Sequence, residues 1–423
     1  MWVMSSEPNA SSDPVALDAS DPLAAFRDEF AVDDDGVIYL DGNSLGRPPR
    51  AAAAAVARVV EKEWRHRLIR GWDDWIDLPR SAGDRIAELV GASAGEVLVG
   101  DSTSVNLYKL AAAALDAAPE GRRVIITDDD NFPTDRYILA GLAERSGAEL
   151  RMIHTDIDAG LDPAALEAAL GDDTALVVLS HVAYRSGALA DMRAVTGLAH
   201  AHGARILWDL CHSAGAVGVE LNDSGADLAV GCTYKYLNGG PGAPAFCYVR
   251  SDLQTELRQP IWGWFSQRDQ FDMGPDYSPV DGIGRFAVGT PPVVALALVD
   301  VAVEVTQRAG MEAIRAKSLR LGEYARALSE EWLRPLGFHL ASPADAARRG
   351  GHLTLAHAEA WRIGQAMRDQ GVIPDYRQPD RLRLGFAPLY NTYADVHDGL
   401  RIIKGIVEKR AFERYDTAHG RVT

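Results

Sequence analysis

The sequence predicts an α/β fold, in which a large domain with a mostly parallel central sheet sandwiched by helices is followed by a smaller α+β domain. Two patterns carry this prediction. Between about residues 96 and 250, short apolar runs alternate with helix-like segments, and from about residue 291 a long apolar helix leads into short strands among helices. With 423 residues, the chain is also long enough for two domains.

The predicted strands of the large domain are short apolar runs that precede helix-like segments or loops. Such β-α alternation is typical of a doubly wound parallel sheet with helices on both faces. The runs are "EVLVG", "RRVIITD", "TALVVLSHV", "RILWD", "DLAVGCTY" and "AFCYVR". Because ligands bind at the carboxyl ends of strands in such sheets, the residues that follow each run are candidates for a functional site.

We expect residues 1–30 to form a partly disordered tail and residues 31–290 to form the large domain, with 31–60 packing in part against the small domain. An alanine-rich helix is expected after residue 50. Residues 291–310 are expected to form a connecting helix. Residues 311–423 form the predicted small domain, whose strands include "GFHLAS", "GHLTLAH" and "RLRLGF".

Composition and charge exclude several classes of function. The net charge of -17 argues against a nucleic-acid partner, because phosphate binding needs a basic surface. No apolar run approaches the roughly 18 residues of a membrane-spanning helix, and the opening residues lack the features of a signal peptide. Cys211, Cys232 and Cys247 form neither an even disulfide set nor a CxxC pair, which fits a cytoplasmic protein. The histidines show no metal-ligand spacing, so no metal site is expected.

Lys235 is the one lysine of six that lies outside helix-like sequence. It follows a predicted strand, lies between Tyr234 and Tyr236, and precedes glycines that let the backbone approach a ligand. A lysine in a mostly apolar site can lose its proton and form an imine, which is the role of lysine toward pyridoxal phosphate. The alternative is a structural lysine at a turn, and the local sequence leaves both interpretations open.

Asp209 ends the run "RILWD", 26 positions before Lys235. An acid at the end of a buried strand is costly without a partner, and a protonated pyridine nitrogen is a suitable one. The alternative for Asp209 alone is a helix cap or a loop acid. His212 follows three residues later and is expected in the same pocket, unless it is a structural histidine.

Two further segments have the character of a cofactor site. In "GDSTSVNLY", hydroxyl groups and free N–H groups at a helix start form an anion site, and Ser104 is expected to cap the helix and contact a phosphate. In "NFPTDRY", Phe132 is expected to stack on an aromatic ring and Asp135 to hydrogen-bond beside it. The alternatives are an ordinary helix cap and a loop with a proline-set helix start.

These segments together resemble the kynureninase family, whose members are pyridoxal-phosphate enzymes of the aspartate aminotransferase fold (fold type I). The likeness runs from about residue 39 to residue 393 and depends on the shared order and spacing of the segments. They are "LDGNSLG", "STSVNLYK", "NFPTDRY", "WDLCHSAGAV", "YKYLNGGPGA" and "APLYN".

The resemblance implies a role for each matched position. Lys235 would be the Schiff-base lysine, and Tyr234 a proton donor or a phosphate ligand. Arg383 would hold the substrate α-carboxylate as a bidentate donor, with Asn43 and Ser44 near the substrate. The implied cofactor site consists of Thr103, Ser104, Phe132, Asp135, Ser180, Asp209, His212, Tyr234, Lys235, Trp264 and Thr290.

The resemblance also implies a reaction and an assembly. Water would cleave the bond between the β- and γ-carbons of L-kynurenine or 3-hydroxy-L-kynurenine, giving anthranilate or 3-hydroxyanthranilate and L-alanine, a step of tryptophan catabolism. Trp264 and Thr290 match positions that reach the phosphate from the neighbouring subunit, so a homodimer with shared active sites is expected. The substrate is a small molecule, and neither nucleic acid nor membrane is an expected partner.

One segment departs from the family pattern. After Trp264 the chain reads Phe265-Ser266-Gln267, where relatives continue with Gly-His, which puts a contact to the aromatic end of the substrate in doubt. The tryptophan-rich segment "RGWDDWIDLPR" either supplies part of that pocket or packs in the core. Alternative functions are another fold type I enzyme, such as an aminotransferase or a cysteine desulfurase, and a non-catalytic protein that binds pyridoxal phosphate.

Overall fold

A seven-stranded sheet forms the centre of the large domain in the computed structural model, which describes residues 7–32, 36–418 and 420. The strand order is β2-β8-β7-β6-β5-β3-β4, and β8 runs in the direction opposite to the other strands of this sheet. The strands are β2 (Val97–Val99), β3 (Val124–Asp128), β4 (Glu149–Ile153), β5 (Thr174–Ser180), β6 (Arg205–Asp209), β7 (Leu228–Gly231) and β8 (Phe246–Val249). All six predicted strands are confirmed, and β4, with its partly exposed "ELRMI", was missed.

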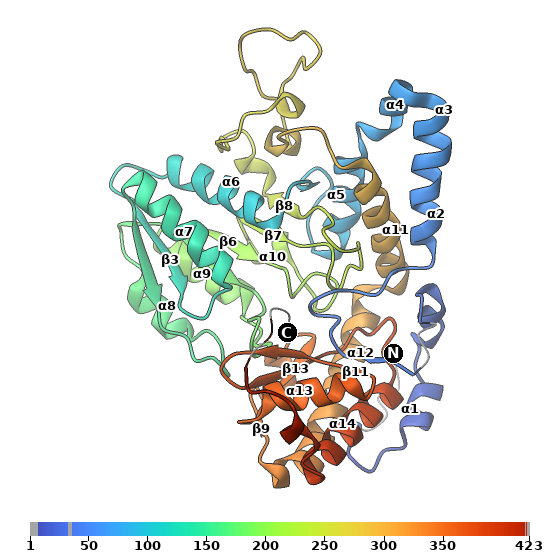
Figure 1. Ribbon diagram of the computed structural model, residues 1–423. Coiled ribbons are helices and arrows are strands. Elements are labelled where there is room, and N and C mark those ends of the chain that lie inside the picture. The colour runs from blue at the N-terminus through green and yellow to red at the C-terminus, as the bar shows by residue number, and fades with distance from the viewer. Residues whose placement is uncertain (1–6, 33–35, 419, 421–423) are drawn as a thin grey trace.

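Both faces of this sheet are buried under helices (Figure 1). In β5, Val177 and Leu179 join one apolar cluster and Leu176 and Val178 the other, which explains why its sequence is a continuous apolar run. One face packs on α5 (Leu78–Leu89), α8 (Pro163–Ala169), α9 (Met192–Ala201), α10 (Leu221–Ser224) and α11 (Val293–Ala309). The other packs on α6 (Thr103–Asp116) and α7 (Pro133–Ser146). Polar side chains are therefore left to the strand ends.

The small domain has a four-stranded antiparallel sheet in the order β12-β13-β10-β9. The strands are β9 (His339–Leu340), β10 (His352–Ala356), β12 (Asp375–Arg377) and β13 (Arg381–Gly385). Helices α12 (Met311–Leu328), α13 (Ala360–Asp369) and α14 (Tyr393–Glu408) complete the domain, which lies below the large one in Figure 1. Leu353, Leu355, Leu382 and Leu384 belong to its apolar core, so the alternate residues of β10 and β13 face the other way.

The segment after residue 36 joins the small domain, as expected. Strand β1 (Ile38–Tyr39) pairs in parallel with β11 (Val372–Ile373), and Leu40 lies in the small-domain core. Residues 38–40 thus tie the start of the large domain to the far end of the chain.

Within the expected partly disordered tail, residues 7–30 include helical segments. Helix α1 (Pro14–Ala19) begins at the N-cap Asp13, and the carboxylate of Asp18 accepts hydrogen bonds from the backbone N–H groups of Tyr393 and Ala394, at 2.7 and 3.0 Å. These N–H groups open α14, where they have no acceptor within the helix. The polar composition of this segment reflects capping contacts, which only the tertiary structure reveals. Residues 1–6 lie outside the described part.

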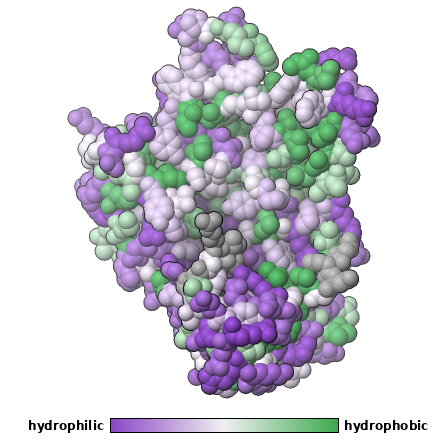
Figure 2. Space-filling view, viewed as in Figure 1, coloured by the Kyte–Doolittle hydropathy of each residue, from purple (hydrophilic) through white to green (hydrophobic). Residues whose placement is uncertain are grey.

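The predicted alanine-rich helix is present, but its hydrogen-bonding pattern changes along its length. Helix α2 (Ala51–Ala57) passes into a π-helical turn (Arg58–Trp64), a single turn α3 (Arg65–Arg67) and a 3₁₀ turn (Leu68–Gly71) before α4 (Trp72–Trp75). Leu68 has a φ of 50°, and it is exposed together with Trp64 and Ile69. Figure 2 shows hydrophobic residues gathered near this arm, at the upper right, whereas the lower part of the view is mostly hydrophilic. Exposed apolar groups on this scale are typical of an interaction surface.

The remaining helical segments are short 3₁₀ or π turns. They are η1 (Ala24–Glu29), η4 (Ser251–Leu253), η5 (Trp264–Ser266), η6 (Ile283–Phe286), η7 (Ser329–Leu333), η8 (Arg334–Leu336), η9 (Ala346–Arg348) and η10 (Ala411–Arg414). Among the described residues, no helix is both long and apolar enough to cross a membrane.

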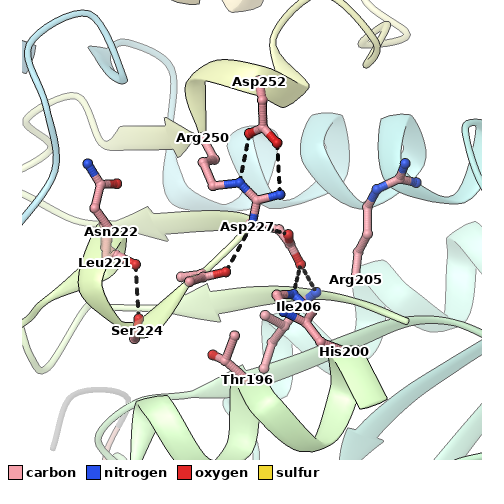
Figure 3. Close-up of polar contacts among 12 residues, drawn as sticks. Thr196, His200, Arg205, Ile206, Leu221, Asn222, Ser224, Asp227, Arg250 and Asp252 are labelled. Carbon is pink, nitrogen blue, oxygen red and sulfur yellow. Dashed lines mark hydrogen bonds and ion pairs between the residues drawn. The ribbon is translucent and has the colours of Figure 1, made fainter. Parts of the chain in front are cut away.

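The buried carboxylate of Asp227 links the amino ends of β6 and β7 through hydrogen bonds and an ion pair (Figure 3). These strand ends lie opposite the carboxyl ends, where the candidate site is. Asp227 Oδ2 lies 2.9 Å from His200 Nε2 and accepts a 2.9 Å hydrogen bond from the N–H of Ile206. Its Oδ1 accepts from Arg250 Nη1 at 2.8 Å, and Arg250 in turn pairs with the exposed Asp252. Every oxygen of Asp227 thus has a partner, which is the condition for a stabilising buried charge.

Replacing Asp227 by Ala is expected to lower the free energy of unfolding by about 3–5 kcal/mol, because it leaves a buried N–H and an arginine without their acceptor. The Asp252→Ala variant, which removes an exposed partner of the same Arg250, is expected to cost less than about 1 kcal/mol. Urea denaturation monitored by circular dichroism measures both. Equal costs for the two variants would contradict the central role of Asp227.

A buried histidine makes the core sensitive to acid. His181 is buried, and its ring meets the edge of Trp208 with the ring centroids 5.8 Å apart. Burial, and next the charge of Arg315, lower the pKa of His181 to about 4. The native state therefore binds fewer protons than the unfolded state between pH 4 and 6.5, and its stability falls as the pH is lowered through this window.

The His181→Phe variant keeps the ring contact and removes the titration. Between pH 7 and 4.5, the native protein is expected to lose about 2–3 kcal/mol more unfolding free energy than this variant. Urea titrations at the two pH values give the four free energies needed, and other groups cancel in the difference. The same pH dependence in both proteins would exclude His181 as the cause.

Candidate active site

Lys235 and His212 meet beyond the carboxyl ends of β7 and β6. Lys235 Nζ lies 3.2 Å from His212 Nε2. Burial, and next the charge of Lys235, hold the pKa of His212 well below its ordinary value, which favours the neutral imidazole beside Lys235 Nζ. The turn that carries Lys235 is backed by Gly46, where a Cβ would lie 2.3 Å from the Lys235 carbonyl oxygen. Only glycine fits at this position of the segment "LDGNSLG".

Two buried carboxyl groups face each other beside this lysine. Asp209 ends β6, and its Oδ1 accepts a 2.7 Å hydrogen bond from the N–H of Cys211. Asp135, from the first turn of α7, has no hydrogen-bond partner for Oδ2 among the described residues. Burial, and next the charge of Asp209, raise the pKa of Asp135 well above its ordinary value. The carboxyl group of Asp135 therefore favours its neutral form, and its Oδ2 is left for a further partner.

The loop between β3 and α7 brings Phe132 and Ser180 to the same edge of the sheet. Phe132 is the N-cap of α7, is 38% exposed, and meets Tyr184 edge to face with the centroids 5.4 Å apart. Ser180, the last residue of β5, donates a 2.8 Å hydrogen bond to Asn131 Oδ1. In β5 and β6, Ser180 pairs directly with Asp209, so these polar groups lie side by side.

A cavity of about 470 Å³ opens at the start of α6 and is lined by Thr103, Ser104 and Tyr234. The structure corrects one expectation, because Ser102 rather than Ser104 caps the helix, accepting from the N–H of Val105. Ser102 is one residue earlier, where the chain is still extended as an N-cap requires. The first N–H groups of this 14-residue helix form a ready anion site. Burial, and next the charge of Cys232, raise the pKa of Tyr234, which keeps its phenolic proton.

These groups fit pyridoxal phosphate. The helix start and its hydroxyl groups suit a phosphate, the exposed ring of Phe132 suits an aromatic ring, and Lys235 suits the aldehyde. The unpartnered Asp135 Oδ2 and the adjacent Asp209 carboxylate leave a place for a protonated ring nitrogen. Lys235, His212, Asp209 and Asp135 are thus brought together as expected, and their roles stay predictions.

Arg383 lies in a polar cluster with the residues predicted to bind substrate. It is 1% exposed and pairs with the equally buried Asp375, its neighbour across β12 and β13. Its Nη1 donates to the carbonyl of Tyr184, and its Nη2 lies 3.2 Å from Ser44 Oγ. With its amide oxygen turned toward the guanidinium, Asn43 accepts from Nε at 3.2 Å and from Nη2 at 3.1 Å. The structure thus gathers Arg383, Asn43 and Ser44 in one place.

Trp264 and Thr290 are not brought to this group within the chain. Trp264 is 39% exposed and contacts the rings of Phe265 and Phe271, and Thr290 is exposed. In the segment that departs from the family pattern, Phe265 lies 6.0 Å from the ring of Trp72. This contact places the segment beside the tryptophan-rich stretch 70–80.

The buried Ser266 Oγ bonds the carbonyl of Gly263 at 2.8 Å and lies 2.9 Å from the hydroxyl of Tyr277. Ser266 therefore stabilises the conformation of its own loop through contacts to Gly263 and Tyr277.

Sequence reasoning missed several residues of the site. Asp375 and Arg377 lie in a three-residue strand, "DYR", that is too short to show a pattern. Asn131 and Tyr184 join the site through Ser180 and Phe132. Asn131 and Tyr184 follow the strands β3 and β5, so their positions near strand ends could have identified them.

Comparisons with known proteins agree on fold and family. Residues 314–403 match the model "Kynureninase C-terminal domain", and residues 84–225 match the "DegT/DnrJ/EryC1/StrS aminotransferase family". Among solved structures, a cysteine desulfurase from Thermococcus onnurineus NA1 has a TM-score of 0.78 at 20% identity, covering 95% of this chain and 100% of its own. A C-DES mutant with glycine covalently linked to its PLP cofactor has a TM-score of 0.77 at 18% identity, covering 89% and 98%. At these identities, the structures show the fold.

The curated relatives are similar along nearly their whole length. A kynureninase from Pseudomonas fluorescens is 45% identical over 409 residues, which are 95% of this chain and 96% of the relative. A kynureninase from Burkholderia pseudomallei (strain K96243) is 46% identical over 406 residues, 94% of this chain and 95% of the relative. With this level of identity over both chains, the protein belongs to the kynureninase family.

Proposed function

We propose that this chain is a pyridoxal-phosphate-dependent hydrolase that cleaves the Cβ–Cγ bond of L-kynurenine or 3-hydroxy-L-kynurenine. Water is the second substrate, and the products are anthranilate or 3-hydroxyanthranilate and L-alanine. The proposal rests on one observation. Lys235, His212 and the Asp135–Asp209 pair lie together beside the cavity at α6. The chain that carries them is 45% identical to a kynureninase.

Each of these residues has a distinct task in the proposed reaction. Bound in the site, the cofactor supplies a ring that accepts the electron pair released at the α-carbon of the amino acid. Lys235 Nζ would hold the aldehyde group of the cofactor and would also carry the α-proton of the substrate. Asp209 keeps the ring nitrogen protonated, and Tyr234, whose pKa is raised by burial, holds a proton for the leaving carbon. The neutral His212 holds Nζ in place through its 3.2 Å contact.

We also propose a homodimer in which Trp264 and Thr290 complete the phosphate site of the neighbouring subunit. Both residues are exposed in the chain, and Trp262, Phe271 and Met273, in the same segment as Trp264, are exposed as well. Exposed aromatic and Met side chains on one segment are typical of an interface.

The proposed location is the cytoplasm, where the three cysteines remain reduced. All three are unpaired and buried in or beside strands of the large sheet. Their burial also argues against a desulfurase, which needs an accessible thiol to receive sulfur, and burial raises the pKa of Cys247 to about 11.

The Lys235→Ala variant is expected to lose at least about 10³-fold in kcat, because it removes both the imine and the proton carrier. Anthranilate and L-alanine are quantified after incubation of the holoenzyme with L-kynurenine, and the native protein is expected to yield them in equal amounts. Lys404→Ala, at an exposed lysine of α14, is the control and is expected to retain native activity. Native protein that binds the cofactor and yields neither product would contradict the function.

Hybrid dimers test whether the sites are shared. A dimer of one Lys235→Ala subunit and one Trp264→Ala subunit contains one fully native site if Trp264 reaches across the interface. Such a hybrid, isolated with two different affinity tags, is expected to show about half of the native activity, whereas each homodimeric variant is impaired. A hybrid no more active than the Trp264→Ala homodimer would place Trp264 in its own subunit's site.

A further inference from the structure

Lys109 is a buried cation that the proposed reaction does not use. Among the described residues, two lysines are buried, Lys109 and Lys317. Lys109 lies in α6, and its side chain is 1% exposed. Its Nζ donates to Asp101 Oδ2 at 2.6 Å and to the carbonyl oxygen of Phe286 at 2.8 Å. A buried ammonium group is costly unless it is paired, so these two acceptors hold Lys109 in one position.

Asp101 brings this ion pair to the wall of the cavity beside α6. The residue lines the cavity together with Thr103 and Ser104. Its φ of 54° is in the left-handed region, which is uncommon for a residue other than glycine. Its carbonyl oxygen accepts a 2.9 Å hydrogen bond from the N–H of Ala245, another residue of the cavity wall. This backbone contact and the hydrogen bond from Lys109 hold Asp101 in its uncommon conformation.

The second acceptor of Lys109 begins a segment that forms another part of the cavity wall. Phe286 is buried and ends η6, and six residues later Pro292 lines the same cavity. The segment between them contains Thr290, which the proposed dimer places at the phosphate site of the neighbouring subunit. Lys109 therefore connects two parts of the cavity wall, the loop before α6 and the segment 286–292.

The charge of Asp101 is unfavourable for a phosphate group in this cavity. Asp101 is the only acidic side chain among the described residues that line it. A phosphate monoester carries about two negative charges at pH 7, and it repels a carboxylate most strongly where little water separates them. The side chain of Asp101 is 29% exposed, so solvent screens only part of its charge. The ion pair with Lys109 neutralises this charge from the buried side.

We infer that Lys109 sets the affinity of the protein for the phosphate group of its cofactor, because it neutralises Asp101 and fixes the cavity wall. Lys109 is a positioning residue, since it acts through Asp101 and Phe286 and does not itself line the cavity. The N–H groups at the start of α6 attract the phosphate, and Lys109 cancels the charge that opposes it. The inference deepens the proposed function and rests on its cofactor site.

The experiment compares pyridoxal phosphate with pyridoxal, which has the same ring and aldehyde but no phosphate group. The full-length protein, freed of its cofactor, is titrated with each compound, and the change in absorbance on binding gives two dissociation constants. Lys109→Met is expected to raise the Kd of pyridoxal phosphate about 30-fold and to leave that of pyridoxal unchanged. A Kd of pyridoxal phosphate equal to native, or an equal loss for both compounds, would overturn the inference.

Lys317→Met is the matched control. Lys317, in α12, is 4% exposed and pairs with the equally buried Asp21 at 2.6 Å. This variant also leaves a carboxylate without its buried cation, but it does so away from the cavity. Both dissociation constants are expected to stay at their native values. A rise in the Kd of pyridoxal phosphate as large as that in Lys109→Met would assign the effect to general destabilisation and overturn the inference.

A double variant tests the role of the Asp101 charge. In the Lys109→Met/Asp101→Asn variant, the carboxylate that Lys109 neutralises is absent. The Kd of pyridoxal phosphate is therefore expected to return to within about 5-fold of the native value. A double variant that binds pyridoxal phosphate as weakly as Lys109→Met does would also overturn the inference.

A conservative variant covers the case in which Lys109→Met does not fold. Lys109→Gln keeps N–H donors for Asp101 and Phe286 and removes the charge, so the Kd of pyridoxal phosphate is expected to rise about 10-fold. An unchanged Kd in this variant contradicts the inference, as does native protein that binds pyridoxal as tightly as pyridoxal phosphate. Because these titrations contain no kynurenine, they fail independently of the proposed reaction.

Discussion

The constraint on which this structure depends is the burial of both faces of its central sheet. With helices on either side, β3, β5, β6 and β7 have no solvent-facing row for polar side chains. Polar groups are therefore confined to the strand ends, where Asp128, Ser180 and Asp209 stand in register or nearly so. A carboxylate in such a place is costly without a cation, and this cost is what makes the carboxyl edge a strong binding site for a protonated ring.

The small domain differs, because polar side chains cover one whole face of its sheet. Its sheet is apolar on one face and charged on the other, and the charged face lies toward the large domain. The site is thus formed by two surfaces that differ in the polarity of their side chains. One is a buried strand edge that carries Asp209 beside Asp135, and the other is a polar cluster in which Arg383 pairs with Asp375.

Much of the fold and part of the site follow from the sequence, because buried parallel strands are recognisable as apolar runs and ligands bind at their carboxyl ends. Lys235, Asp209 and His212 were found in this way. The capping role of Asp18 and the pairing of Asp375 with Arg383 were not, since both depend on contacts between segments hundreds of residues apart. The change from α-helical to π-helical hydrogen bonding after residue 57 is likewise not visible in the sequence, whose residues favour a regular α-helix. Trp264 and Thr290 are exposed in one chain, and the residues that would surround them in the proposed dimer belong to the second subunit.

The segment Asn43–Gly46 is packed so closely that it links two parts of the site mechanically. Asn43 and Ser44 hold the guanidinium of Arg383, and two residues later Gly46 lies against the carbonyl of Lys235 and donates its N–H to the carbonyl of Tyr234 at 2.8 Å. At Gly46 a Cβ would collide with the carbonyl of Lys235 and with Asn238, so a displacement of this segment is passed on to the lysine turn. Occupation of the polar cluster around Arg383 by a substrate would thus be felt at the backbone of the lysine turn.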